Sequence, residues 1–193
     1  LIAVAEERNA ISYKGVSGGA DIIRKHLYNL YEGNFALKMA DLGTIKAGAT
    51  LKDTYVALQK VLDELMTKGI MPIILGGSQD LTYAQYMAYQ SFEKKIDLAV
   101  IDACIDVDIR SEQAELPKAN NYLNAIFTQE PSYLFNYSSI GYQTYFVPQT
   151  TIQLMDKLYF DNYRLGEIRK DITDMEPVMR EADLLSIDIT AIK

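Results

Sequence analysis

The sequence IDLAVIDACID, residues 96–106, decides the fold. Its first six residues, 96–101, are largely apolar, which is typical of a strand that is buried on both faces of a sheet. Asp102 follows this run directly. Two further apolar runs, 70–75 and 184–187, likewise lead straight into glycine or aspartate. These junctions predict short buried strands with polar residues at their carboxyl ends.

Working outward from these junctions, apolar runs alternate with segments of helical periodicity. This order predicts a three-layer α/β/α sandwich around a mostly parallel sheet, since such strands need helices on both faces. We expect one domain, residues 1–193, and a fragment of a longer protein because both ends lie at an apolar run. The strands are predicted at 1–5, 35–42, 70–75, 96–101, 137–142 and 183–189, and the helices at 20–31, 50–68, 81–92, 121–128, 151–159 and 173–181.

The composition indicates a folded, acidic protein. The 193 residues are 49% hydrophobic and 23% charged, a balance that disordered chains do not have. The 19 Lys and Arg residues against 26 Asp and Glu residues give a net charge of −7. The sequence contains no basic cluster of the kind that binds phosphate backbones. We therefore expect neither a nucleic acid nor an anionic membrane as partner.

The cysteine count and the lengths of the apolar stretches indicate the cellular compartment in which the protein is found. Cys104 is the only cysteine, which excludes an intrachain disulfide and suits a reducing environment. The longest apolar stretches, 70–75 and 98–101, fall far short of the ~20 residues that a membrane span needs. The start of the chain shows no charged region followed by a hydrophobic core. These features predict a cytoplasmic protein.

Three aspartates follow predicted strands and are candidate ligands. Asp102 and Asp106 follow one strand, and Asp188 follows another. In parallel sheets ligands gather at the carboxyl ends of strands, and carboxylates there suit a hard cation. The alternative is structural, because aspartate after a strand is also a common turn or N-cap residue.

Together the junctions resemble the motifs of the ureohydrolase family, which includes arginase, agmatinase and formimidoylglutamase. The family's motifs, GGxH, DAHxD and SxDxDxxDP, occur here in the same order as GGSQ (76–79), DACID (102–106) and SIDITAIK (186–193). The likeness extends to residues 19–28 and 40–43 and covers nearly the whole chain in register. The resemblance implies an arginase-like α/β fold in which the family's C-terminal portion is missing.

The resemblance also implies a metal centre with altered ligands. In the family these motifs hold a pair of manganese ions, which share a hydroxide that attacks a guanidinium or formimino carbon. Carried over by position, two histidines and one aspartate of the family become Gln79, Cys104 and Thr190. The retained carboxylates are Asp102, Asp106 and Asp188. This pattern predicts a diverged member in which manganese is absent or reduced to a single weakly held divalent ion.

Other positions depart from the family as well. Lys193 replaces the later aspartate of the third motif. His26, the only histidine, lies on the predicted helix 20–31 and is interpreted as a surface residue. Without an imidazole near the junctions, no side chain there has an unperturbed pKa suited to proton transfer near neutrality.

These residues leave three hypotheses for function. The first is a pseudoenzyme that has lost efficient C–N hydrolysis and acts as a binding module or regulator. The second is a hydrolase of linear amidines, formimidoylglutamase-like, that uses one metal ion on Asp102, Asp106 and Asp188. The third is a zinc hydrolase in which Cys104 is a ligand, although a single cysteine after a strand is more often a small buried hydrophobe. The resemblance further implies a small guanidino or formimino ligand and a homo-oligomer, since relatives assemble as trimers or hexamers.

Overall fold

The computed structural model describes residues 1–11, 18–31, 33–34, 37–108 and 116–191. These residues divide into two compact units, an N-terminal unit of residues 1–88 and a C-terminal unit of residues 89–193. All strand pairings within each unit are parallel. The predicted α/β class with parallel strands is therefore confirmed. A single domain over 1–193 stays a prediction.

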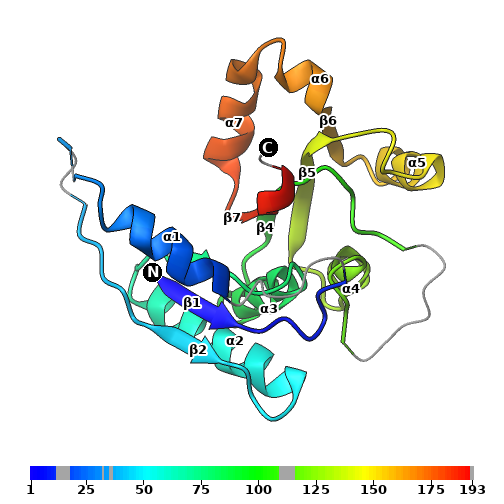
Figure 1. The fold of residues 1–193 in the computed structure, drawn as a ribbon. Coiled ribbons are helices and arrows are strands. Elements are labelled where there is room, and N and C mark those ends of the chain that lie inside the picture. Colours follow the sequence, from blue (N-terminus) through cyan, green and yellow to red (C-terminus); the bar gives the residue numbers. More distant parts are fainter. Residues whose placement is uncertain (12–17, 32, 35–36, 109–115, 192–193) are drawn as a thin grey trace. The chain divides into compact units, whose positions relative to one another are not determined.

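The N-terminal unit is a three-stranded parallel sheet with three helices (Figure 1). The strand order is β2-β1-β3, and Val4 at the centre of β1 is fully buried. Helix α2 contacts β2 and α3, and α1 contacts β3. The elements are β1 (Ile2–Ala5), α1 (Gly19–Leu27), β2 (Thr44–Lys46), α2 (Leu51–Thr67), β3 (Ile74–Leu75) and α3 (Leu81–Ala88).

Helix α2 illustrates how closely local sequence sets an element in this unit. Thr50 is its N-cap: the side chain accepts a hydrogen bond from the Asp53 amide, and the Asp53 carboxylate accepts one from the Thr50 amide. This reciprocal pair is a capping box. Leu58 and Leu62 lie on the buried face, and Gly69 follows the helix with φ +69°. The predicted helix at 50–68 is confirmed.

The C-terminal unit is a four-stranded parallel sheet in the order β6-β5-β4-β7. Helices α6 and α7 contact β5 and β4, and α5 contacts β6 (Figure 1). Tyr137, Leu98 and Met155 from three of these elements are buried in its core. The elements are β4 (Ile96–Ile101), α4 (Tyr122–Phe127), β5 (Leu134–Tyr142), α5 (Gln149–Lys157), β6 (Asp161–Arg164), α6 (Leu165–Ile168), α7 (Met175–Glu181) and β7 (Leu184–Ile187), with 3₁₀ turns at Tyr89–Phe92, Ile172–Asp174 and Ile189–Ala191.

The strand predicted at 35–42 is wrong. Of this range the structure describes residues 37–42, and none of them is in a strand. Asp41 is held instead by the Arg24 guanidinium, with Nε at 2.7 Å, and also accepts a hydrogen bond from the Gly43 amide. Gly43 has φ +87°, so the chain turns there and pairing with β1 begins only at Thr44.

Two further elements differ from expectation. The run 70–75 was expected to be a buried strand, but β3 covers only its last two residues, and Met71 is 86% exposed. Pro72 has no amide hydrogen to donate to a neighbouring strand, which is consistent with this short pairing. The sequence also gave no signal for β6 and α6, because Asp161–Arg164 is polar and lacks a strand-like run.

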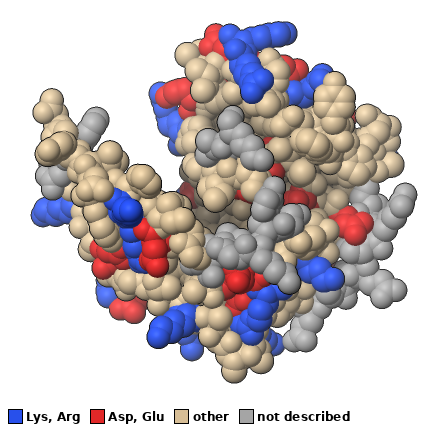
Figure 2. Space-filling view, viewed as in Figure 1, with Lys and Arg blue, Asp and Glu red and all other residues tan. Residues whose placement is uncertain are grey.

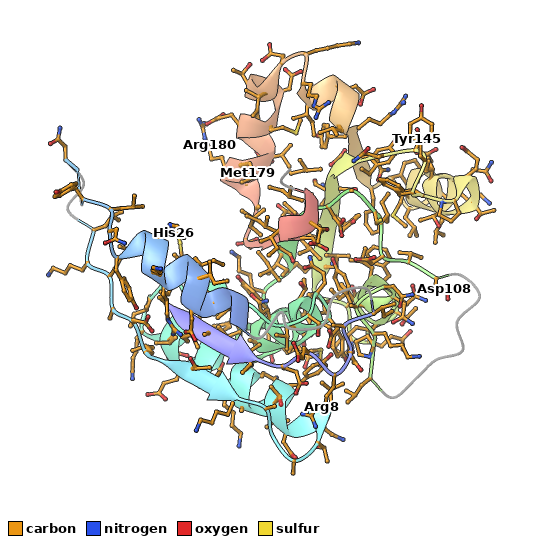
Figure 3. All side chains as sticks on the ribbon, viewed as in Figure 1. Arg8, His26, Asp108, Tyr145, Met179 and Arg180 are labelled. Atoms are coloured by element: carbon orange, nitrogen blue, oxygen red, sulfur yellow. The ribbon has the colours of Figure 1, made fainter. Side chains whose placement is uncertain are left out.

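Charged side chains of both signs lie together on the surface of the protein. Lys and Arg side chains are interspersed with Asp and Glu side chains on the face drawn in Figure 2. Among the helices that the structure describes, none is long and apolar enough to cross a bilayer. His26 lies exposed on α1, as predicted (Figure 3).

Candidate functional site

The C-terminal unit brings the three predicted aspartates to one edge of its sheet. Asp102 and Asp106 follow β4, and Asp188 follows β7, which is the parallel neighbour of β4. The amide of Asp188 donates a hydrogen bond to the carbonyl oxygen of Ile101 at 2.9 Å. The carboxyl ends of the two strands therefore coincide, and the aspartates interact electrostatically across them.

Asp102 and Asp106 share a proton rather than both being ionised near neutrality. Burial, the adjacent negative charge of Asp102 and a hydrogen bond to it raise the pKa of Asp106 to about 8. The Asp106 carboxyl group is then the donor and the Asp102 carboxylate the acceptor. Burial also raises the pKa of Asp102, which is 4% exposed, although the amide of Cys104 partly offsets this. Proximity of like charges in a poorly solvated place is the physical cause in both cases.

The structural alternative for these aspartates is also observed. Oδ1 of Asp102 accepts a hydrogen bond from the Cys104 amide at 2.9 Å. Oδ1 of Asp188 accepts one from the Thr190 amide at 2.8 Å. Both are local turns in which an aspartate caps the backbone two residues on. Each carboxylate thus shapes its own loop, and that of Asp102 also accepts the hydrogen bond from Asp106.

Cys104 lies half-buried beside this cluster. Burial, followed by the negative charges of Asp102, Asp106 and Asp188, raises the pKa of its thiol to about 11. The thiol is therefore protonated at neutral pH while no cation offsets these charges. Whether Cys104 serves packing or ligates a metal stays a prediction.

Gln79 belongs to the N-terminal unit, in the turn between β3 and α3. The turn is fixed by the Ser78 amide, which donates to the carbonyl oxygen of Glu6 at 3.0 Å. It also requires Gly77, which has φ +81° and no room for a Cβ, since Leu81 would lie 2.1 Å from it. Gln79 itself is half-buried. Lys193, the remaining position carried over from the family, lies outside the described residues.

Sequence reasoning missed a polar network around this turn. Glu6 is fully buried and accepts hydrogen bonds from the side chains of Arg8 and Thr54. Asp80, also fully buried, accepts one from the hydroxyl of Tyr55. The sequence signal was Glu6, which directly follows the apolar run 1–5, whereas Asp80 comes five residues after the run 70–75 and has no such signal.

A second missed feature adjoins Asp102 on β5. Gly141 has φ +92°, and a Cβ there would lie 3.6 Å from the carbonyl oxygen of Asp102. Two residues later the Gln143 amide donates to the carbonyl oxygen of Ala103 at 2.9 Å. The loop after β5 is therefore bound to the loop that carries the aspartates.

The donor set after β4 and β7 differs from the one that the family resemblance implies for a pair of manganese ions. Beside the three carboxylates, the loops after these strands offer the thiol of Cys104 and the hydroxyl of Thr190, and they carry no imidazole. In the part of the chain that the structure describes, no three His, Cys, Asp or Glu side chains are gathered so as to hold an ion. The carboxylates can instead accept hydrogen bonds from a cationic organic group, for which their charge and partial burial are suited.

Comparison with known proteins gives one family. The sequence model described as the arginase family matches residues 1–192. Among curated proteins, a formimidoylglutamase from Photorhabdus laumondii is 24% identical over 186 residues, which are 91% of this chain and 57% of that protein. The chain thus spans little more than half the length of this relative.

Solved structures agree on the fold. A formiminoglutamase from Trypanosoma cruzi with Mn²⁺₂ matches with a TM-score of 0.81 and 17% identity, over 93% of this chain and 65% of that one. A formimidoylglutamase from Bacillus subtilis matches with a TM-score of 0.78 and 20% identity, over 96% of this chain and 62% of that one. At these identities the matches concern the fold.

Proposed function

Because this chain belongs to the arginase family, we propose that it is a diverged, formimidoylglutamase-like member. It binds a small formimino or guanidino compound and has lost the dinuclear manganese centre and efficient C–N hydrolysis. The observation that carries the proposal is the donor set after β4 and β7. It combines three carboxylates with Cys104 and Thr190 and contains no imidazole.

The chemistry of the cluster favours an organic cation. Amidinium and guanidinium groups are planar and present several N–H donors, which pair well with carboxylate oxygens. When such a cation approaches, its charge favours the ionised form of Asp106, so the proton shared with Asp102 is released. Asp102 and Asp188 remain fixed by their turns while their second oxygens accept hydrogen bonds. The cluster thus supplies binding energy, whereas hydrolysis would also need an activated water and a proton donor.

The test is to measure metal content and ligand binding in the same preparation. We expect no stoichiometric Mn²⁺ pair by elemental analysis after incubation at millimolar Mn²⁺, and no product from formiminoglutamate, agmatine or arginine. Calorimetric titration with these compounds should show binding that Asp106→Ala weakens. Asp108→Ala is the matched control, because Asp108 lies two residues further along the same loop (Figure 3). A tightly held Mn²⁺ pair, or turnover by the unmodified protein, would contradict the proposal.

A second candidate is a hydrolase that works with one divalent ion. Its support is that Asp102, Asp106 and Asp188 follow two neighbouring strands and interact electrostatically, and that oxygen donors suit Mg²⁺ or Mn²⁺. In the described residues these side chains are not gathered closely enough to hold an ion, so this candidate requires them to move together. Binding of one such ion, abolished by Asp106→Ala and accompanied by turnover, would establish it. The zinc alternative requires that Zn²⁺ binding be lost in Cys104→Ser.

Restoring the family's ligands gives an independent check on the first proposal. The triple variant Gln79→His, Cys104→His and Thr190→Asp should bind Mn²⁺ more tightly than the unmodified chain. If the triple variant and the unmodified chain bind Mn²⁺ equally, the three substitutions are not the cause of the loss.

A further inference from the structure

The C-terminal unit contains a polar pocket near the aspartate loop, on the far side of β5 from β4. It has a volume of about 140 Å³ and lies where β5 and β6 end. Two arginines line it, and none of the lining residues that the structure describes is acidic. The side chains that matter here are those of Tyr142, Gln143, Thr144, Tyr145, Arg164 and Arg169.

The two arginines are available to a ligand. Both are exposed, and among the described residues neither has an ion-pair partner within 4.0 Å. The nearby carboxylate of Glu167 is turned to the backbone, where it accepts a hydrogen bond from the Arg164 amide at 3.1 Å. Tyr145, 93% exposed, stands at the rim (Figure 3).

The neutral residues of the pocket add donors at fixed positions. Tyr142 is 6% exposed and sits at the end of β5, so its ring is held by the sheet. Gln143 and Thr144 follow on the same loop, and the Gln143 amide is bonded to Ala103. The loop after β5 therefore lies between the aspartate cluster and the pocket: one end adjoins Asp102, and the other lines the pocket.

We propose that the Arg164–Arg169 pocket binds the carboxylate of the ligand whose cationic end lies at the aspartate cluster. The proposal deepens the proposed function and rests on it for the cationic end. Guanidinium groups bind carboxylates and phosphates through the same paired N–H donors, so oxyanion chemistry is what the pocket recognises. The adjoining acidic cluster favours a ligand that carries charges of both signs, as an amino acid with a formimino group does. It disfavours free phosphate, which has no cationic end.

The test uses L-glutamate and inorganic phosphate as probes in calorimetric titrations of the purified protein. L-Glutamate should bind, and Arg164→Gln and Arg169→Gln should each raise its Kd about tenfold or more. Arg164→Lys should give an intermediate Kd, because it keeps the charge but loses the planar fork. The matched control is Arg180→Gln, since Arg180 is an exposed arginine on α7 of the same unit, paired with Glu176 (Figure 3). Circular dichroism verifies that each variant is folded.

Two outcomes would overturn the proposal. The first is an unchanged Kd for L-glutamate in both arginine variants. The second is phosphate binding that is tighter than L-glutamate binding, which would assign the pocket to phosphate. A final titration separates this inference from the proposed function. If N-formimino-L-glutamate binds no more tightly than L-glutamate, the role of the aspartate cluster fails, while the anion pocket stands.

Discussion

Glu6 is a buried charge whose stability depends on its hydrogen-bond donors. Burial raises the pKa of its carboxyl group, but hydrogen bonds from Arg8 and Thr54 outweigh burial and lower the pKa from 4.5 to about 2. A depressed pKa means that the ionised form stabilises the fold above pH 4.5. This contribution is lost as the pH falls from 4.5 toward 2.

We therefore expect Glu6→Gln to lower the free energy of unfolding at pH 7 by about 1.5–3 kcal/mol, the range for hydrogen bonds to charged groups. The difference from the unmodified chain should shrink as the pH falls through this window. Urea unfolding at several pH values measures it. Glu64→Gln is the control, because Glu64 forms an exposed ion pair with Lys68 and should change stability by less than about 0.5 kcal/mol. A pH-independent effect of Glu6→Gln would refute the linkage.

Gly77 supports a second prediction at the scale of a single residue. Gly77→Ala places a Cβ 2.1 Å from Leu81 Cδ1 and forces alanine to adopt φ +81°. We expect a loss of about 1–2 kcal/mol from the backbone alone, with more from the displacement of the buried Leu81 side chain. Thermal unfolding measures the loss. Gly166→Ala is the control, because a Cβ there meets open space and no positive φ is required. Equal melting temperatures for the two variants would contradict this account.

At the scale of elements, the capping box of α2 is the clearest case of sequence fixing structure. Thr50→Ala removes the side chain that accepts from the Asp53 amide. We expect a loss of about 1 kcal/mol in the free energy of unfolding, as for other N-caps. Thr67→Ala at the exposed C-terminal end of the same helix should have a much smaller effect. Chemical denaturation of both variants decides the point, and similar losses would show that the cap contributes little.

Elements with a strong periodic signal were predictable, and those that depend on distant partners were not. β4 begins and ends where its apolar run does, at Ile96 and Ile101. Residues 37–42 instead form no strand, because the Arg24–Asp41 pair and Gly43 hold that segment in another conformation. The strand β6 is polar and is held by its pairing with β5, a contact that no local pattern reveals.

The same distinction applies to the candidate site. The convergence of Asp102, Asp106 and Asp188 followed from the rule that parallel strands end at one edge. Their second role, in capping turns, was an alternative that the residue types also allowed. The arginine pocket was not predictable, because Arg164 ends β6 and Arg169 follows α6, and the sequence pattern indicates neither element.

At the scale of the whole molecule, the sheet of the C-terminal unit ends at β7, with apolar side chains exposed. Leu185 is 38% and Ile187 is 44% exposed, and β7 has one strand partner in the described residues. Uncovered edges of this kind promote association. We expect light scattering to show a mass that rises with concentration and that Ile187→Lys lowers. Ile172→Lys is the control, since Ile172 is 73% exposed but lies outside the sheet. The same measurement tests the homo-oligomer implied by the family resemblance, and an unchanged mass in Ile187→Lys would exclude β7 as the contact.

The reactivity of the Cys104 thiol should report whether a cation is bound at the neighbouring aspartates. Because burial and, after it, the surrounding negative charges raise the pKa of Cys104 to about 11, its alkylation by iodoacetamide should be slow at pH 8. A cation bound among these aspartates offsets their negative charge and lowers the pKa of the thiol. Alkylation should then be faster, unless the bound compound itself covers the sulfur atom. The chain has no other cysteine. The alkylation rate, followed by mass spectrometry, therefore reports ligand binding at the aspartate cluster without an engineered probe.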